Sequence, residues 1–269
     1  MIMYSPEKTY RMVVKTGYKK VKKTLSEKLI LGFMGGLFIS LGYLLDIRVI
    51  AGLSDQWGTF SNFIGGAVFP VGLICILLVG GELITSNMLV IPVALFEKRV
   101  NFLQLMNNWF CITLSNLAGA LFVAYFFGHV VGLTDTEPFL SKTIHIAEVK
   151  VGDSFWVAFI SGIGCNIFVC VAVWLCFSAK SFSGKVLGIW LPIMSFVSIG
   201  FQHVVANMFI IPAAIFAGYL TWMDFLMNFI SVFLGNVVGG IIFIGLAYNS
   251  VQKGTNNKAE KKCTKTISR

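Results

Sequence analysis

The sequence contains few charged residues for its length. Of its 269 residues, 12 % are charged and 57 % are hydrophobic, whereas a soluble domain carries about 25 % charged residues. Too few polar side chains remain to cover a water-exposed surface, and the mean hydropathy is +0.82. The composition therefore predicts an integral membrane protein.

The sequence also lacks the usual motifs of catalysis and metal binding. It has no GxSxG motif and no paired carboxylates in its apolar segments, and its six cysteines form no CxxC pair. Five of these cysteines lie in apolar runs, where a buried thiol behaves as a small hydrophobe. We therefore expect no disulfide framework, no metal, no cofactor and no enzymatic activity.

Apolar segments long enough to span a membrane recur along the chain. A bilayer core about 30 Å thick requires about 20 apolar residues per helix. We expect six transmembrane helices, at about 28–50, 61–96, 102–128, 153–178, 186–217 and 225–249. The second and fifth segments are too long for one plain helix and contain glycine, proline and polar residues in the middle. The sequence thus predicts an all-α fold in which helices two and five are interrupted.

Basic residues are distributed unevenly between the two ends of these segments. Eighteen of the 21 lysines and arginines lie in the N-terminal stretch, in the loops after the second and fourth segments, and in the C-terminal tail. Only Arg48, Lys142 and Lys150 lie on the opposite side. The positive-inside rule then predicts a multi-pass cell-membrane protein with both termini in the cytoplasm. The net charge of +9 reflects topology and attraction to the lipid bilayer, and it does not indicate nucleic-acid binding.

The polar ends of the chain flank the membrane domain. Four apolar residues recur at helical spacing within residues 1–27: Val14, Tyr18, Val21 and Leu25. This spacing predicts an amphipathic helix on the cytoplasmic membrane surface, although the stretch could serve as a topology signal only. We expect residues 28–250 to form the six-span domain and residues 251–269 to form a basic cytoplasmic tail.

The two halves of the chain resemble each other at a spacing of 120 residues. The matched pairs include Gly80 with Gly200, Asn87 with Asn207, Pro92 with Pro212, Asn108 with Asn228, and Asn116 with Asn236. Upstream, the same spacing pairs Gly32 and Gly42 with Gly152 and Gly162. Each copy, at about 28–128 and 150–249, contains three spans, so the second copy must be inverted relative to the first. The broken helices of the two copies are expected to meet near the midplane and to mark a transport pathway.

Two strongly ionisable residues, Glu82 and His203, lie at membrane depth in these interruptions. Buried ionisable groups in membrane helices usually face a bundle interior or an aqueous path. We expect His203 to give a proton or a hydrogen bond to a permeating anion; the alternative is a neutral histidine that bonds the broken backbone. Glu82 either holds the first break by accepting backbone N–H bonds, which we favour, or takes part in proton transfer.

Other polar residues near the breaks have two possible roles. Thr85 begins the second half-helix, where its hydroxyl either caps the helix or also faces the pore. Asn87 and Asn207 are expected to bond the discontinuous backbone, and Gln202 is expected to support the second break. Lys150 precedes the fourth span, and its position alone suggests a solvated loop residue. Half-helix N-termini that point inward favour an anionic cargo.

Three segments resemble the signatures of the formate–nitrite transporter family. They are LLVGGELITS at 77–86, GIGCNIFVCVA at 162–172 and GFQHVVANM at 200–208. The resemblance extends over about residues 5–250. It implies an aquaporin-like fold and a homopentamer with one pore per protomer. It also implies passage of small monovalent weak-acid anions, chiefly formate, nitrite or hydrosulfide.

The resemblance also implies roles for individual residues. By position, Thr85 and His203 correspond to the central pore pair, Asn166 to a residue of the central region, and Lys150 to the vestibule lysine. The family commonly has Glu before the pore histidine, whereas this chain has Gln202. This difference puts a Glu–His proton relay in doubt.

Four apolar residues flank the two breaks, and ordinary packing would explain them if they stood alone. The resemblance implies that Leu83 and Phe196 form a constriction on the periplasmic side. It places Phe69 and Leu73 toward the cytoplasmic side.

Transport of a weak acid is favoured by the cost of desolvating an ion. A bare anion in a dry apolar ring loses hydration worth roughly tens of kcal/mol in the Born limit, and a neutral acid avoids most of this cost. We therefore expect Lys150 to attract the anion, His203 to protonate it and Thr85 to orient it. The alternative is an aquaporin-like channel for water or small neutral solutes, although its two asparagines lie in Asn-Met rather than Asn-Pro-Ala. The sequence leaves open the physiological anion, proton coupling, the direction of flux and gating by the N-terminal helix.

Overall fold

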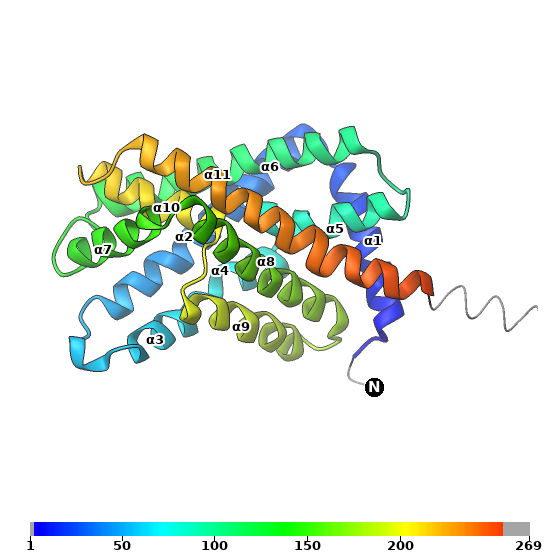
Figure 1. The fold of residues 1–269 in the computed structure, drawn as a ribbon, viewed down its shortest axis with the longest axis horizontal. Helices are drawn as coiled ribbons and strands as arrows, with labels where there is room; N and C mark the ends of the chain where they lie inside the picture. Colours follow the sequence, from blue (N-terminus) through cyan, green and yellow to red (C-terminus); the bar gives the residue numbers. More distant parts are fainter. Residues whose placement is uncertain (1–2, 255–269) are drawn as a thin grey trace, which may run out of the picture.

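The computed structural model describes residues 3–254, and helices are the only regular elements in this part of the chain (Figure 1). Six of these helices are long and apolar enough to cross a membrane, which confirms the predicted number of spans. They are Leu25–Ile50, Phe60–Gly80, Phe102–Val130, Phe155–Ser178, Phe182–Ile199 and Trp222–Gly254.

The elements follow one another with short connections. In chain order they are α1 (Pro6–Val21), α2 (Leu25–Ile50), η1 (Asp55–Trp57), α3 (Phe60–Val68), α4 (Val71–Cys75), η2 (Ile76–Gly80), α5 (Ile84–Phe96), α6 (Phe102–Phe122), η3 (Val123–Val130), α7 (Phe139–Gly152), α8 (Phe155–Ser178), α9 (Phe182–Ile199), α10 (Val204–Phe216), α11 (Trp222–Val238) and η4 (Gly239–Leu246). Several helices begin at a capping box, in which an N-cap side chain and the residue three positions later bond each other's backbone N–H. Thr24 with Glu27 does so for α2, and Asn101 with Gln104 does so for α6.

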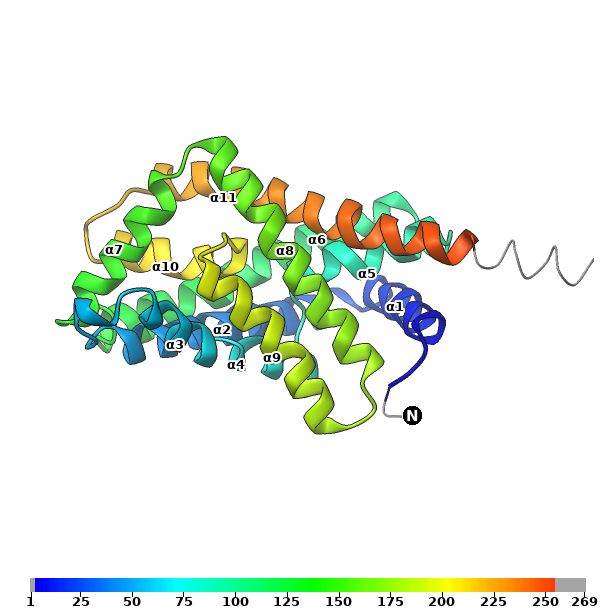
Figure 2. The same ribbon diagram turned by 60° about the horizontal axis from the view of Figure 1, so that its bottom comes forward.

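Helices two and five are interrupted where the sequence predicts. The first parts end at Gly80 and Gly200, whose φ angles of 125° and 91° strongly favour glycine. The second parts, α5 and α10, begin at Ile84 and Val204 and are almost completely buried. From the middle of the molecule, α5 extends toward the end that carries the N-terminus, and α10 extends toward α7 at the opposite end (Figure 1). Figure 2 shows α10 between α11 and α2, with which it is in contact.

Matching hydrogen bonds stabilise each half internally. Asn116 Oδ1 accepts the N–H of Ile84 at 2.9 Å, and its Nδ2 donates to the carbonyl of Gly32 at 2.7 Å. Asn236 makes the equivalent bonds to Val204 at 3.0 Å and to Gly162 at 2.8 Å. Gly32 is therefore equivalent to Gly162 and not to Gly152. The predicted spacing of 120 is wrong in the first span of each copy, where it is 130, because the first copy has a longer connection between its first two spans.

The N-terminal helix packs on the protein through a face that only partly matches the predicted one, because Val21 belongs to both. Its buried residues are Thr9, Tyr10, Val13, Gly17 and Val21. A Cβ at Gly17 would overlap the Val90 carbonyl oxygen, so α1 lies directly against the backbone of α5. Of the other residues named from the sequence pattern, Val14 is partly buried, Tyr18 is 43 % exposed, and Leu25 belongs to α2, where it is 60 % exposed.

Both ends of the described chain lie at the same end of the molecule (Figure 1). The last span continues as helix to Gly254, so residues 251–254 are part of it rather than of a tail. The rest of the predicted basic tail lies outside the described residues. At the opposite end, helix α7 was not predicted from the sequence.

Candidate pore site

The two interrupted helices meet at Thr85 and His203. Thr85 Oγ1 lies 3.0 Å from His203 Nε2, and both side chains are buried. His203 is also the N-cap of α10, because its Nδ1 accepts the N–H of Ala206 at 3.1 Å. With Nδ1 acting as an acceptor, the neutral ring carries its proton on Nε2 and can donate it toward Thr85. The ring therefore has both roles considered from the sequence, since it bonds the broken backbone and presents an N–H to the partner half-helix.

Asn166 stabilises the backbone next to this pair through hydrogen bonds. Its Nδ2 donates to the carbonyl of Asn236 at 2.6 Å and to the Thr85 carbonyl at 3.4 Å. The side chain thereby links α8 to the N-terminal turn of α5 and to α11. Its contacts are those of a supporting residue, and it is not among the lining residues of the three cavities described next.

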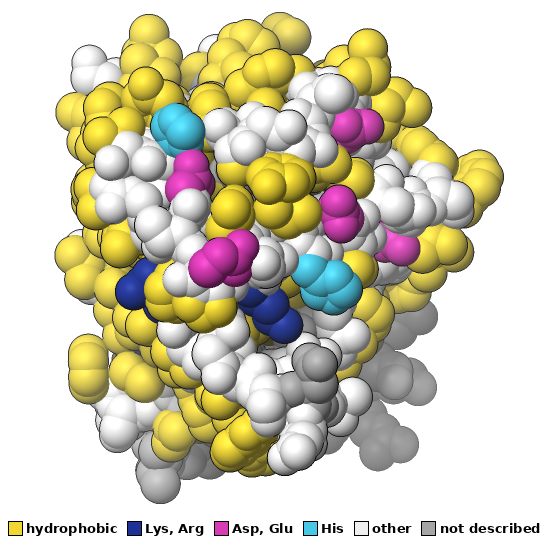
Figure 3. All heavy atoms as spheres, turned by 90° about the vertical axis from the view of Figure 1, so that its left-hand side faces the viewer, with side chains coloured by type: hydrophobic (Ala, Val, Ile, Leu, Met, Phe, Trp, Pro, Cys, Tyr) yellow, Lys and Arg dark blue, Asp and Glu magenta, His cyan; other side chains and the backbone are white. Residues whose placement is uncertain are grey.

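Two adjacent cavities with shared lining residues lie between α7 and His203. The outer one, which we call the vestibule, has a volume of about 240 Å³ and is lined by Tyr43, Asp46, Ile50, Asn62, Lys142, His145, Ile146, Val149, Lys150, Val197 and Gly200. The inner one, which we call the central cavity, has a volume of about 40 Å³ and is lined by Tyr43, Phe69, Lys150, Phe196, Val197, Phe201, His203, Ala206 and Asn207. Tyr43, Lys150 and Val197 border both. The α7 end presents basic, acidic and histidine side chains within a hydrophobic rim (Figure 3).

A third pocket lies on the far side of His203 and is apolar. It leaves no space for a water molecule, and its lining consists of Ile39, Phe69, Leu73, Leu83, Val169, Ile193, Phe196 and His203. The pathway is therefore closed here in this conformation.

The four apolar residues named from the sequence gather around His203 and the closed pocket. The rings of Phe69 and Phe196 meet edge to face with centroids 6.0 Å apart, and both border the central cavity with Lys150. Leu73 and Leu83 line only the closed pocket beyond them. All four residues line the closed pocket, and the contact of Phe69 with Phe196 is an addition to the expected pairs.

Lys150 belongs to helix α7 rather than to a solvated loop. Its Nζ donates to the carbonyl of Gly200 at 3.1 Å and to that of Phe201 at 3.4 Å, which satisfies carbonyls left free by the second break. Burial of the ammonium group lowers the pKa of Lys150 below the ordinary lysine value. Lys150 borders both the vestibule and the central cavity, so its ammonium form presents a positive charge to both.

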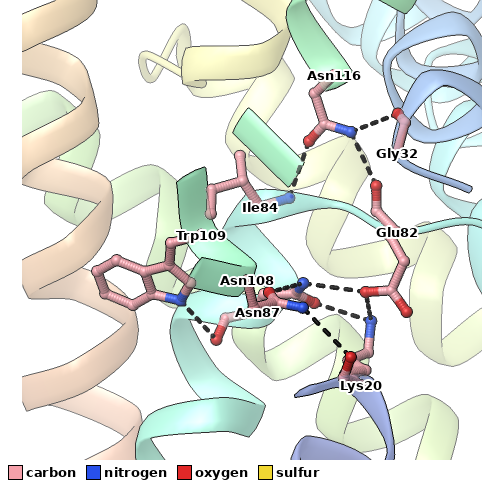
Figure 4. A network of polar contacts seen from close by, with 8 residues as sticks. All are labelled: Lys20, Gly32, Glu82, Ile84, Asn87, Asn108, Trp109 and Asn116. Carbon is pink, nitrogen blue, oxygen red and sulfur yellow. Dashed lines mark hydrogen bonds and ion pairs between the residues drawn. The ribbon is translucent and has the colours of Figure 1, made fainter. Parts of the chain in front are cut away.

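Glu82 belongs to a buried polar network at the first break (Figure 4). Its Oε2 accepts from Lys20 Nζ at 2.7 Å and from Asn87 Nδ2 at 3.0 Å. Lys20 Nζ also donates to Asn87 Oδ1 at 2.8 Å, and Asn87 Nδ2 donates to Asn108 Oδ1 at 2.9 Å. Glu82 thus helps to hold the break, mainly through side chains rather than through the backbone N–H groups that we expected.

Gln202 occupies the same place at the second break. Its Nε2 donates to Asp153 Oδ2 at 2.8 Å and to the Lys150 carbonyl at 3.0 Å. Its Oε1 accepts from Asn207 Nδ2 at 2.6 Å, and that amide also donates to Asn228 Oδ1 at 2.8 Å. Asn207 and Gln202 therefore hold the second break together, in a network parallel to that of Glu82.

Lys20 and Lys150 occupy equivalent positions but have different partners. Asn108 Nδ2 donates to the Lys20 carbonyl at 3.4 Å, and Asn228 Nδ2 donates to the Lys150 carbonyl at 2.8 Å. Lys20 forms an ion pair with Glu82, whereas Lys150 forms none within residues 3–254. The first lysine is neutralised, and the second keeps an unpaired charge beside the cavities. Lys20 was not recognised from the sequence, although a spacing of 130 residues pairs it with Lys150.

Comparison with known proteins shows what the chain resembles. Residues 7–250 match the sequence profile of the family described as formate/nitrite transporter. The chain is 56 % identical to an uncharacterized transporter of Bacillus subtilis, YrhG, over 92 % of this chain and 93 % of that protein. It is 54 % identical to the formate channel BtFdhC of Bacillus thuringiensis, over 92 % of this chain and 95 % of that protein.

Solved structures resemble the fold closely. An FNT family ion channel superposes with a TM-score of 0.84 at 24 % identity, covering 89 % of this chain and 97 % of that chain. A pentameric formate channel with formate bound superposes with a TM-score of 0.76 at 31 % identity, covering 86 % of this chain and 98 % of the other. The named relatives are channels and transporters rather than enzymes.

Proposed function

Because the chain belongs to the formate/nitrite transporter family, we propose that it conducts a small monovalent weak-acid anion across the membrane, with formate as the first candidate. The observation that carries this proposal is the unpaired ammonium group of Lys150 at the junction of the vestibule and the central cavity. A positive charge in a partly desolvated cleft raises the local concentration of anions. The central cavity that Lys150 borders is also lined by His203.

We propose the following order of events. The anion enters the vestibule and pairs with Lys150, which replaces part of its hydration. It then enters the central cavity and replaces the Thr85 hydroxyl as the acceptor of the His203 Nε2–H bond. Thr85, released from this bond, offers its hydroxyl to the anion. Beyond His203 the apolar pocket around Leu73 and Leu83 excludes charge, so the species that crosses is the neutral acid.

Protonation by His203 requires a brief change at its other nitrogen. In the N-cap arrangement Nδ1 is an acceptor and the ring is neutral. To become an imidazolium, Nδ1 must release the Ala206 N–H and take a proton that arrives from water in the vestibule. The imidazolium then transfers its Nε2 proton to the anion, and neutral imidazole and neutral acid remain. Because a cation at a helix N-terminus is unfavourable, the charged ring is short-lived. The neutral ring that remains carries its proton on Nδ1, and it caps α10 again only after Nδ1 returns this proton to water and Nε2 takes one up from water.

The choice of formate rests on size and on relatives. The central cavity has room for only a few water-sized groups, which suits formate, nitrite or hydrosulfide better than a larger carboxylate. Among these anions, formate is favoured by the relative of Bacillus thuringiensis, which is named a formate channel and matches over 92 % of this chain.

We further propose a homopentamer in the cell membrane, with residues 28–250 as the pore domain and both termini in the cytoplasm. The pentamer is suggested by the related formate channel of known structure, which is pentameric. Large apolar side chains are exposed along one face of α6 and suit contact with lipid or with a neighbouring protomer: Phe102, Leu103, Met106, Phe110 and Leu114. The basic residues at the end that carries the termini favour the cytoplasmic assignment.

Uptake of labelled formate by proteoliposomes tests the proposal. We expect saturable uptake that is accelerated by an acidic exterior and competed by nitrite and hydrosulfide more strongly than by lactate. Lys150→Gln should raise the KM about tenfold, because it removes the attracting charge. His203→Asn keeps an N-cap side chain but cannot carry a proton, and it should slow uptake by roughly ten- to a hundredfold and flatten its pH dependence. Unchanged rate and pH profile in His203→Asn would refute protonation at this residue.

A further inference from the structure

Asp46 is a buried carboxyl group in the wall of the vestibule. It lies near the end of α2, is only 4 % exposed and borders the vestibule. Its Oδ1 has no hydrogen-bond partner within the described residues, and it forms no ion pair there. The fold makes room for this oxygen, because a Cβ at position 65 would overlap it and Gly65 has none. An ionised carboxylate in such a place is costly unless a proton or a nearby cation compensates it.

The charged groups around Asp46 are arranged by the neighbouring elements. Helix α7 contributes Lys142, His145 and Lys150 to the lining of the vestibule, and the charges of the two lysines act on Asp46. Tyr43 is the other titratable group of α2 in this lining. The faces of α3 and α9 contribute Asn62 and Val197, which are uncharged.

The remaining charged groups nearby point elsewhere. Arg48, also on α2, donates to the Leu133 carbonyl at 3.4 Å and lies over the ring of Phe139. Asp153 accepts from Gln202 at the base of α7. Glu148 is exposed on α7 and does not border the vestibule. The lining of the vestibule therefore contains two lysines (Lys142 and Lys150), one histidine (His145) and one carboxyl group (Asp46).

We propose that Asp46 exchanges a proton with the vestibule solution and thereby sets the charge that an incoming anion meets. This inference rests on the proposed function and adds a residue that controls anion capture. With Asp46 ionised, the carboxylate offsets one of the two lysine charges and repels the anion. With Asp46 protonated, both lysine charges act on the anion, and the carboxyl O–H adds a hydrogen-bond donor to the wall.

The sign of the effect follows from this change of charge. As the pH outside the vestibule falls, Asp46 takes up a proton, and the affinity for the anion rises. As the pH rises, Asp46 loses the proton, and the affinity falls. A neutral side chain of the same shape should therefore hold the vestibule permanently in its high-affinity state.

Asp46→Asn is the direct test, because asparagine preserves the size of the side chain and cannot lose a proton. Formate uptake by proteoliposomes should show a KM about five- to tenfold lower than that of the unmodified protein at alkaline external pH. The two proteins should have the same KM at acidic external pH, and the maximal rate should change little. An Asp46→Asn variant whose KM follows pH as in the unmodified protein would overturn the proposal.

Lys142→Gln is the matched control, because it removes a positive charge from the same wall. It should raise the KM at every pH, and combining it with Asp46→Asn should cancel most of the change at alkaline pH. A pH-independent loss of both rate and thermal stability in Asp46→Asn would show that Asp46 is a permanent counter-ion of Lys150, which contradicts proton exchange.

A readout that is independent of transport separates this inference from the proposed function. Difference infrared spectroscopy of the purified protein should show a protonated-carboxyl band that declines as the pH rises and is missing from Asp46→Asn. The absence of such a band overturns the role of Asp46 even if formate is transported. Its presence without formate uptake would refute formate as the cargo and leave the titration of Asp46 supported.

Discussion

The hydroxyl oxygen of Thr85 lies 3.0 Å from Nε2 of His203, so a hydrogen bond joins the second parts of the two interrupted helices where they begin. The two residues come from opposite repeats, yet their repeat equivalents are Val205 and Leu83, which are apolar. The halves share a scaffold of asparagine contacts and differ at the position where their helices meet. The difference places one polar pair next to a pocket that is otherwise apolar.

Replacement of Thr85 should affect both stability and transport. Thr85→Val removes the hydroxyl and leaves the buried Nε2–H of His203 without its partner, which should cost about 1–3 kcal/mol of stability. Formate uptake should slow, because the anion loses a group opposite His203. Thr85→Ser keeps the hydroxyl and serves as the control. Equal uptake and equal thermal unfolding of the valine and serine variants would contradict a role for this bond.

The ion pair of Lys20 and Glu82 should hold α1 against the first break. Glu82→Gln leaves a buried lysine charge unpaired and should destabilise the protein by about 3–5 kcal/mol. Trypsin should then cleave α1 faster at its exposed lysines. The double variant Lys20→Gln with Glu82→Gln removes both charges and should recover most of the loss. If the double variant is as unstable and as protease-sensitive as Glu82→Gln, the ion pair is not what secures the helix.

Gln202→Glu should not be a neutral change in this chain. The Gln202 amide donates to Asp153 Oδ2 at 2.8 Å, and a carboxylate there would face a second carboxylate. We expect a loss of about 1–3 kcal/mol of stability and a higher KM for formate, because Lys150 gains a negative neighbour. Adding Asp153→Asn restores a donor and should recover the stability but not the KM. Recovery of both would show that the charge beside Lys150 is irrelevant to anion capture.

The charge of Lys150 should set the alkaline limit of anion capture. Burial lowers the pKa of Lys150, so its ammonium group loses its proton at a lower pH than an ordinary lysine, and affinity for the anion falls as the pH rises through that value. Lys150→Arg stays charged and should retain affinity at alkaline pH. Uptake is measured in the Asp46→Asn background, in which Asp46 no longer titrates. An identical alkaline decline with lysine and arginine would assign the decline to another group.

The sequence alone predicts the spans and breaks because their signals are local. The length of each apolar run limits the number of spans, and Gly80 and Gly200 provide the φ angles at which the helices stop. The matched asparagines likewise predict that two similar halves exist, because they are polar groups repeated at one spacing in an apolar environment.

Features that depend on packing between distant segments were missed or misassigned. Lys20 was not recognised as the equivalent of Lys150, because the longer connection after α2 shifts the register by ten residues, from 130 to 120. The buried face of α1 includes Gly17, whose close approach to α5 is not indicated by the spacing of the apolar residues. The contact of Phe69 with Phe196 joins two different spans, and no local sequence pattern indicates how these spans are placed relative to each other.

Stopped-flow light scattering of proteoliposomes tests the central claim most directly. Vesicles are exposed to a gradient of formate or of an impermeant sugar, and swelling is recorded at acidic and alkaline external pH. The account predicts rapid swelling with formate that is faster at acidic pH and slower in Lys150→Gln, with water permeability equal to that of protein-free vesicles. Rapid water flow without formate-dependent swelling would contradict it and would identify a channel of the aquaporin type instead.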